Sequence, residues 1–540
     1  PGVSIPMRDL HLPGRSVAMG RHGAAATSHS LATITAIDIL KRGGNATDAA
    51  IAACAVQGVV EPGSTGIGGD NFVLYAPADT DTRKGGKVYG LNGSGHAPKA
   101  LTADLLMKQG LNEIPLTSPH AVTVPGAVDA WVKLNARFGK MPLSELLQPA
   151  IRFAEEGFPI TERVATDWRR NEAKLKADAN TARMWLKDGR PPQFGETFRE
   201  PEHAKVLREI AARGRDGFYS GWVAEDMVSY LRGLGATHTL EDFAAQEAFW
   251  VDPIATRYKD VEILEIPPNG VGIITLLMLN ILNGFDLSKY DPVGVERFHI
   301  EAEATRLAFQ ARDLYVADPA FADVPVQKLL SMEFADELRG RIDLKKAMAA
   351  PGPVGGQAYR DTVYLSVVDE AGNACSFINS LFWPYGTALT SPKTGVLLQN
   401  RGAGFKVQPG HLNCVEPRKR PLHTIIPAMA LKDGRPWLSF GVMGGGFQPV
   451  GQSHVLTNVV DFGMNVQEAI DCARGFHVGG KFEAERGIRE DVLRGLASLG
   501  HEIKPAEMPH GGGQAILIDR GNGVLQAGSD PRKDGCALAY

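Results

Sequence analysis

The sequence predicts a layered α+β fold, and three observations lead to this prediction. Apolar residues recur at helical spacing through most of the region from about 122 to 346. Short segments with the alternating pattern of strands dominate after residue 362. No internal repeat or low-complexity linker interrupts the chain. We therefore expect helices and strands to pack against one another in layers.

The individual elements can be assigned in order along the chain. Two helices are expected at 32–42 and 46–59, separated by Gly43 and Gly44, because glycine commonly ends a helix. A glycine-rich turn at 63–70 then leads into a strand at 71–75. The later helices are expected at 142–156, 203–213, 224–234, 295–315 and as a pair within 453–474, and the later strands at 362–369, 373–381, 394–399, 427–432, 437–442 and 514–518.

Composition and charge exclude several classes of protein. The 540 residues carry a net charge of −4 without a basic tract, so no nucleic-acid or membrane partner is expected. The five cysteines are scattered, without CxxC spacing, which is typical of reduced thiols in a reducing compartment. No signal-peptide pattern opens the sequence, and no apolar run reaches the roughly 18 residues of a membrane span. These features predict a cytoplasmic protein.

Thr362 carries the strongest chemical signal in the chain. It follows Asp361 and opens the alternating stretch 362–369. A backbone break between these two residues would place a hydroxyl nucleophile and an α-amino base on one residue. The ordinary pKa of an α-amine is about 7.7 to 8.0, so modest lowering would let it accept the hydroxyl proton near neutral pH.

A glycine turn at 441–446 follows the expected strand and could direct backbone amides at a developing oxyanion. Taken singly, both features have ordinary structural interpretations. A threonine often opens a strand, and a glycine triplet often forms only a tight turn.

The sequence contains no complete motif for a serine hydrolase, a dinucleotide-binding site or a metal site. The nearest approach to a G-x-S-x-G elbow, at 451–455, lacks the second glycine. The glycines at 66, 68 and 69 do not form G-x-G-x-x-G. His501 and Glu502 lack the second histidine of an H-E-x-x-H motif, and no other metal-ligand spacing is present. We therefore expect no metal and no cofactor.

Short motifs follow one another in a distinctive order along almost the whole chain. They lie at 43–50, 61–62, 66–69, 124–127, 141–143, 309–313, 318–319, 366–369, 372–374, 395–398, 420–422, 444–446 and 529–532. This order resembles that of the γ-glutamyltranspeptidase-like family of N-terminal nucleophile (Ntn) hydrolases.

The resemblance implies a fold and a set of catalytic residues. The fold would be a four-layer αββα sandwich, one Ntn-hydrolase domain made from both fragments of a precursor that cleaves itself between Asp361 and Thr362. The large chain would be 1–361 and the small chain 362–540, and two such processed heterodimers could form a homodimer. Thr362 would be the nucleophile, Gly444 and Gly445 the oxyanion hole, and Ser380 a hydroxyl bonded to the nucleophile. Ser380 could equally be an exposed strand serine.

Departures from the family's pattern concern the substrate. Ser94 stands where the family has an arginine for the α-carboxylate of a γ-glutamyl donor. Ala403 replaces an aspartate for the α-amine, and His423 with Thr424 replaces paired serines. A zwitterionic donor buried without charged partners would bind poorly. A γ-glutamyl substrate such as glutathione is therefore not expected.

Arg401 remains near the expected pocket, with His96 and His423 as further candidates. An arginine can hold a carboxylate with two parallel hydrogen bonds, so a small acidic amide is the expected substrate. The segments 92–100 and 398–405 look like those of the oxamate amidohydrolase-like subgroup, which hydrolyses oxamate to oxalate and ammonia. The expected substrate-binding residues are Arg401, Ser94, His96, His423 and Thr424.

Several alternatives stay open. Arg401 could instead form a surface or interface salt bridge. Both histidines are expected to be structural or polar pocket residues rather than catalytic ones, because the α-amine already supplies the base. The enzyme could be a γ-glutamyl transferase or hydrolase, or a cephalosporin-type acylase. An uncleaved scaffold or binding protein with the same fold is the non-enzymatic alternative.

Overall fold

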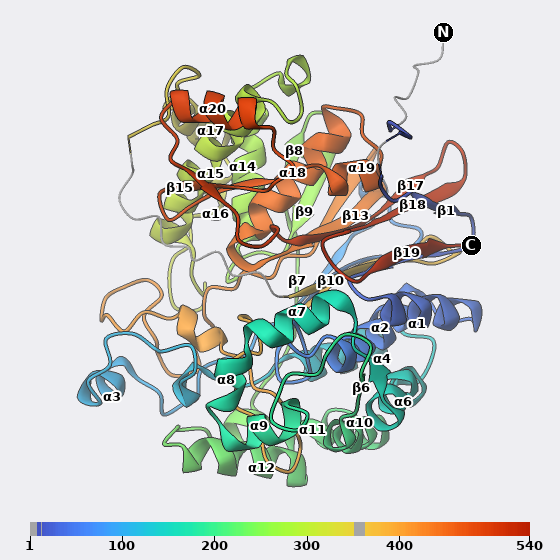
Figure 1. The fold of residues 1–540 in the computed structure, drawn as a ribbon, viewed down its shortest axis with the longest axis vertical. Helices are drawn as coiled ribbons and strands as arrows, with labels where there is room; N and C mark the ends of the chain where they lie inside the picture. Colours follow the sequence, from blue (N-terminus) through green and yellow to red (C-terminus); the bar gives the residue numbers. More distant parts are fainter. Residues whose placement is uncertain (1–7, 12, 350–361) are drawn as a thin grey trace.

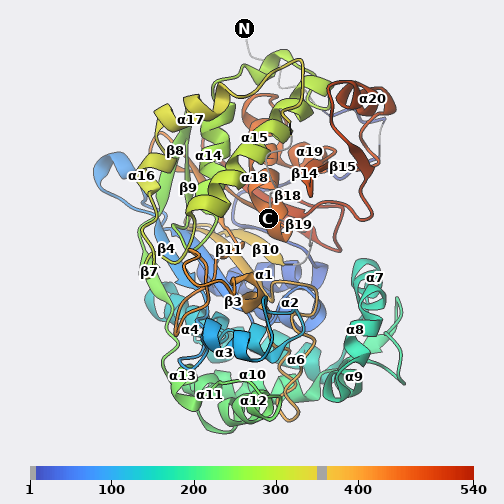
Figure 2. The same ribbon diagram turned by 90° about the vertical axis from the view of Figure 1, so that its left-hand side faces the viewer.

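Two seven-stranded sheets stack face to face, and helices cover both outer faces (Figure 1). The computed structural model describes residues 8–11, 13–349 and 362–540, so Asp361 lies outside the described residues. The view at 90° shows the same order of helices, sheet, sheet and helices (Figure 2). The α+β class and the four-layer αββα arrangement are confirmed.

The first sheet carries Thr362 at the head of one of its central strands. All its neighbouring strands are antiparallel. In spatial order the strands are β19 (Cys536–Ala539), β2 (Ala24–Thr27), β10 (Val363–Val368), β11 (Ala374–Ser380), β3 (Asp70–Ala76), β4 (Tyr89–Gly93) and β7 (Phe249–Val251). The register sets Val363 opposite Asn379 and Ser380 opposite Asp70. The start of β10, the end of β11 and the start of β3 therefore lie side by side at the same end of the strands.

The second sheet supplies the glycine turn. Its strands are, in spatial order, β1 (Ala18–Gly20), β18 (Val524–Ser529), β17 (Gly512–Asp519), β13 (Arg435–Met443), β12 (Ala428–Lys432), β9 (Val261–Glu265) and β8 (Ile254–Tyr258). Buried apolar side chains from both sheets, including Leu74, Tyr364 and Ile516, fill the space between them. This apolar contact fixes how the two sheets lie on each other.

The two outer layers consist of separate sets of helices. The layer on the first sheet includes α1 (Ser30–Lys41), α2 (Ala46–Val60), α4 (Ala127–Phe138), α5 (Leu143–Leu146), α6 (Gln148–Glu156), α10 (Pro201–Arg213), α11 (Asp216–Tyr219) and α12 (Gly221–Gly233). The layer on the second sheet includes α14 (Gly272–Leu282), α15 (Val295–Tyr315), α17 (Met332–Arg339), α18 (Gln448–Val460), α19 (Val466–Asp471) and α20 (Glu490–Ser498).

Shorter elements complete the structure. They are α3 (Ala103–Lys108), α7 (Glu162–Arg170), α8 (Glu172–Lys176), α9 (Ala179–Trp185), α13 (Leu240–Ala244), α16 (Val326–Leu329), and the small sheets formed by β5 (Phe158–Pro159), β6 (Thr197–Phe198), β14 (Gly475–Val478), β15 (Lys481–Ala484) and β16 (Ile503–Pro505). No helix in the described ranges is both long enough and apolar enough to cross a bilayer.

Three expectations about the elements were wrong. The strand expected at 394–399 does not form, because the segment pairs with the residues just before it through only one isolated antiparallel bridge, Thr390 to Leu397. The helix expected at 142–156 is divided into α5 and α6, since Pro149 lacks an N–H and starts a new helix. The region predicted to be mainly helical also contributes β7, β8 and β9, whose alternating pattern was overlooked.

Candidate active site

Thr362 is fully buried immediately before β10, and its hydroxyl meets that of Ser380. The distance from Thr362 Oγ1 to Ser380 Oγ is 3.0 Å. Ser380 Oγ also accepts the backbone N–H of Phe382 at 2.9 Å. Because that bond occupies a lone pair of Ser380, the hydroxyl proton of Ser380 can be donated to Thr362 Oγ1. Ser380 is buried rather than exposed.

The glycine turn between β13 and α18 has a backbone that other residues rarely adopt. The φ angles of Gly444 and Gly445 are 134° and 56°. A Cβ added at Gly444 would also lie 3.0 Å from the Cα of Gly511. The turn leads into α18, and the first N–H groups of a helix have no partner within it. Such a turn can offer backbone donors to a negative charge.

Arg401 is fully buried at the start of a short 3-10 helix, Arg401–Gly404. Its Nη1 donates to Thr424 Oγ1 at 2.8 Å. The centre of its guanidinium lies 4.1 Å from the ring centroid of Phe382. Because Phe382 N–H in turn bonds Ser380 Oγ, contacts run without a break from Thr362 to Arg401. A surface salt bridge of Arg401 is excluded by its burial.

His423 and Asp70 form a fully buried pair with His423 Nε2 2.8 Å from Asp70 Oδ2. Burial is the main cause that lowers the pKa of His423 to about 4; the positive charge of Arg401 lowers it too, and Asp70 opposes both. The imidazole is therefore neutral at pH 7. A carboxylate oxygen accepts, so the proton lies on Nε2 and Nδ1 carries a lone pair.

Asp70 also organises the loops around this pair. Its Oδ1 accepts hydrogen bonds from Gly95 N, Gly126 N and Gln399 Nε2, at 3.0, 3.0 and 2.9 Å. One carboxylate thus joins the start of β3 to three other segments and to His423. A buried charge with this many donors is well satisfied.

Ser94 and His96 both lie in the loop after β4, and they form hydrogen bonds with different partners. Ser94 Oγ accepts from Asn269 Nδ2 at 3.1 Å, and the backbone oxygen of Asn269 accepts the N–H of His423 at 2.9 Å. Ser94 is therefore linked to His423 through one residue. His96 Nδ1 contacts the backbone oxygen of Ala97 at 2.9 Å, and burial lowers its pKa. Arg401 lies close to Thr424 and His423. Ser94 reaches His423 through Asn269, whereas His96 instead contacts Ala97.

A cavity of about 550 Å³ borders these groups. Its lining includes Phe382, Thr424 and Gly446, and also the cationic Arg312 and Lys406. A ligand in this cavity can thus reach the partner of Arg401 and the glycine turn together. The only cluster of potential metal ligands among the described residues belongs to other elements, α15 and the segment after α20.

Sequence reasoning missed Asp70, Asn269 and Phe382. Asp70 was counted as part of the glycine-rich turn, although an acidic residue at the head of a buried apolar strand is a usable signal. Asn269 and Phe382 carry no such signal, because their roles depend on contacts between distant segments.

The sequence model of the family described as "Gamma-glutamyltranspeptidase" matches residues 32–540.

The chain belongs to the gamma-glutamyltranspeptidase family.

As a gamma-glutamyltranspeptidase family member, it is an Ntn hydrolase and an enzyme, as predicted from the motif order. It is similar to the "Glutathione hydrolase-like YwrD proenzyme" of Bacillus subtilis, with 37% identity over 96% of this chain and 99% of the relative. The "Oxamate amidohydrolase proenzyme" of Klebsiella pneumoniae is 34% identical over 96% of this chain and 98% of its own length. The crystal structure of cephalosporin acylase from Bacillus halodurans is 39% identical, covers 100% of this chain and 99% of its own, and superimposes with a TM-score of 0.91.

Proposed function

We propose that this enzyme is a self-processing amidohydrolase that uses Thr362 to cleave small amides with a carboxylate on the acyl part, such as oxamate. One observation carries the proposal. Contacts run from Thr362 Oγ1 through Ser380 and Phe382 to the buried guanidinium of Arg401. A nucleophile and an anion-binding group are thus held in one connected site.

The proposed maturation uses the same hydroxyl. Thr362 Oγ1 attacks the carbonyl carbon of Asp361, and the peptide nitrogen leaves as the α-amine of Thr362. Water then hydrolyses the resulting ester, which yields the chains 1–361 and 362–540. Two relatives bear the word "proenzyme" in their names, and this supports processing here.

The proposed hydrolysis repeats this chemistry on the substrate. Thr362 Oγ1 attacks the amide carbon while the freed α-amine accepts the hydroxyl proton. The amine then passes the proton to the leaving nitrogen, and ammonia departs. Water, activated by the same amine, attacks the ester and releases the acid. We assign Gly444 and Gly445 to the developing oxyanion and Ser380 to orienting the nucleophile.

Substrate recognition would depend on the charged groups. Arg401, held by Thr424, would take the carboxylate with a two-pronged hydrogen bond. His423 Nδ1 has no hydrogen-bond partner among the described residues, and its lone pair can accept an N–H of the substrate. Ser94 and Ala403 stand where a γ-glutamyl donor would need charges. This supports an acidic amide over a γ-glutamyl compound.

A second candidate is an acylase for larger acidic amides, such as glutaryl amides. Oxamate is much smaller than the neighbouring cavity of about 550 Å³, and pockets of ~300–1,000 Å³ usually hold drug-sized ligands. The similarity to cephalosporin acylase, with a TM-score of 0.91, favours the same alternative. Arg401 would hold the far carboxylate of the acyl group in this case.

A panel of amides assayed on matured protein tests the proposal. We expect ammonia release from oxamate and turnover of a γ-glutamyl anilide at least about tenfold lower in kcat/KM, a difference of roughly 1.4 kcal/mol. Faster turnover of a glutaryl amide would select the second candidate. Efficient turnover of the γ-glutamyl anilide would overturn the argument from Ser94 and Ala403. Thr362→Ala protein supplies the background rate.

A further inference from the structure

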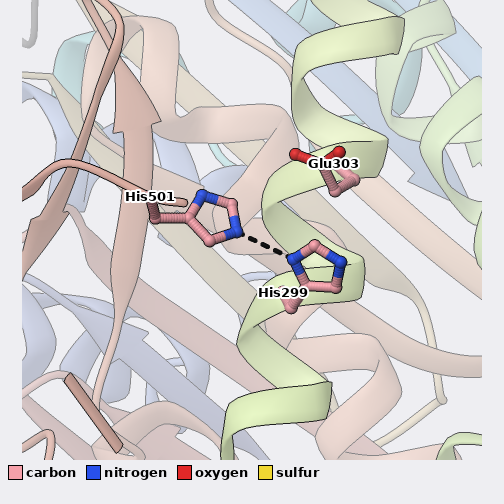
Figure 3. Close-up of side chains that lie close together, drawn as sticks. All are labelled: His299, Glu303 and His501. Carbon is pink, nitrogen blue, oxygen red and sulfur yellow. Dashed lines mark hydrogen bonds between the residues drawn. The ribbon is translucent and has the colours of Figure 1, made fainter. Parts of the chain in front are cut away.

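Three potential metal ligands converge in the helical layer on the second sheet (Figure 3). His299 and Glu303 lie four residues apart on α15 and so share one face of the helix. His501 follows α20 and points at His299. One ligand atom from each side chain lies within 4.8 Å of the others, and all three residues are buried. None of them takes part in the site around Thr362.

The hydrogen bonds show which ring nitrogens carry lone pairs. His299 Nε2 lies 2.8 Å from the backbone oxygen of Asp343, which can only accept. In the neutral imidazole the proton is therefore on Nε2, and His299 Nδ1 holds a lone pair. His299 Nδ1 lies 2.8 Å from His501 Nε2, so its lone pair can accept the Nε2 proton of His501. The Nδ1 of His501 has no hydrogen-bond partner among the described residues.

Neighbouring backbone and side-chain groups hold these side chains in place by hydrogen bonds. The Asp343 oxygen orients the His299 ring, a common arrangement for a metal-bound histidine. Glu303 accepts from Arg306 Nη1 at 2.9 Å and from Met348 N at 2.8 Å. Each carboxylate oxygen keeps a second lone pair, so Glu303 can still bind an ion.

A cavity of about 560 Å³ borders the cluster at His501, which lines it together with His477. Arg306 and Lys346 also line this cavity and oppose a cation, so the ligands must bind strongly for a metal to remain.

We propose that His299, Glu303 and His501 bind one zinc-like transition-metal ion. Two imidazoles and one carboxylate suit Zn²⁺ far better than Mg²⁺ or Ca²⁺, which prefer oxygen ligands. Zinc bonds of about 2.0–2.1 Å place tetrahedral ligand atoms about 3.3 Å apart. The His299 and His501 nitrogens, now 2.8 Å apart, need to separate by about 0.5 Å, and the Glu303 oxygen, within 4.8 Å of them, needs to adjust to the same spacing. The proton of His501 moves from Nε2 to its unpartnered Nδ1, and no proton is released.

The site would join the parts of the chain on either side of residue 362. His299 and Glu303 precede that position, and His501 follows it. If the chain is cut there, the ion would bind both fragments at once. The proposal does not depend on the cut, because the three residues converge in the uncut chain.

Metal uptake by the full-length protein tests this proposal. Chelator-treated protein is mixed with Zn²⁺ or Co²⁺, passed through a gel-filtration column and analysed for metal. We expect about one equivalent of Zn²⁺ per chain, visible absorption from four-coordinate Co²⁺ and a higher Tm with Zn²⁺ than without. Both His299→Gln and His501→Gln should weaken Zn²⁺ binding about 100-fold and abolish the Co²⁺ spectrum.

A matched control and the wild-type spectrum make the outcome decisive. His22 is an exposed histidine outside the cluster, and the control variant His22→Gln should bind Zn²⁺ like wild type. Mg²⁺ should give no Tm shift. Absence of a Co²⁺ spectrum in the wild-type protein would overturn the proposal, whatever the variants do. Unchanged Zn²⁺ binding by both ligand variants would overturn it too.

Discussion

The proposed nucleophile region (Thr362, Ser380, Gly444 and Gly445) and the proposed acyl-binding region (Asp70, Arg401, His423 and Thr424) rely on different chemistry. Hydroxyls and backbone amides make up the first region. The second buries a carboxylate and a guanidinium around a neutral imidazole. Burying charge costs several kcal/mol per ion unless each charge is paired. Such charges are therefore expected where a ligand must be recognised, while neutral groups suffice to position the nucleophile.

Because of this difference, substitutions in the two regions are expected to change the kinetics in different ways. Changes in the nucleophile region should abolish chemistry for every substrate. Changes in the acyl-binding region should discriminate between substrates with and without a negative charge. Three substitutions test the division, taken from the largest expected effect to the smallest.

Thr362→Ala should have the largest effect. The variant lacks the hydroxyl needed for both maturation and hydrolysis, so amidase activity should fall by about 10⁴-fold or more. Denaturing electrophoresis should show one band at 58.0 kDa, where wild type should give fragments of about two thirds and one third of that mass. Thr166→Ala, on an exposed face of α7, is the control and should mature normally. A wild-type chain that stays whole on long incubation would favour the scaffold alternative.

Arg401→Ala should have an intermediate effect confined to acidic amides. The kcat/KM for oxamate should fall about 100-fold, or roughly 2.7 kcal/mol, mainly through a higher KM. For the uncharged ester of oxamate, kcat/KM should fall much less. The kcat/KM of Arg401→Lys for oxamate should lie between those of wild type and Arg401→Ala, because lysine keeps the positive charge but lacks the two parallel N–H donors of the guanidinium. If Arg401→Ala lowers the rate of maturation and the kcat/KM for both substrates equally, Arg401 has a structural role.

Asp70→Asn should have the smallest effect of the three. An amide N–H₂ facing His423 Nε2 would force the imidazole into the other tautomer and remove the lone pair from Nδ1. We expect about a tenfold loss in kcat/KM with maturation intact, measured by steady-state kinetics. Asp226→Asn is the matched control, since Asp226 is a buried acceptor for Ser391 and Thr394 away from the site. If both variants lower Tm alike and neither changes kcat/KM, Asp70 serves folding alone.

The contact between Thr362 and Ser380 was predictable because it is local. Thr362 immediately precedes β10, Ser380 ends β11, and a short turn joins these two antiparallel strands. The turn at Gly444 follows directly from a strand that the alternating pattern predicted. Errors in the fold came from similar local effects that were overlooked, such as Pro149 restarting a helix.

The sequence by itself determined the fold class, the position of Thr362 and the family, because strand and helix periods and motif order are properties of contiguous residues. Only the tertiary structure decided which buried polar groups meet. Asp70 reaches His423, and His299 reaches His501, across more than 200 residues in each case. A side chain's protonation state and ligand capacity depend on such neighbours. Neighbours this distant are set by how the sheets and helices pack.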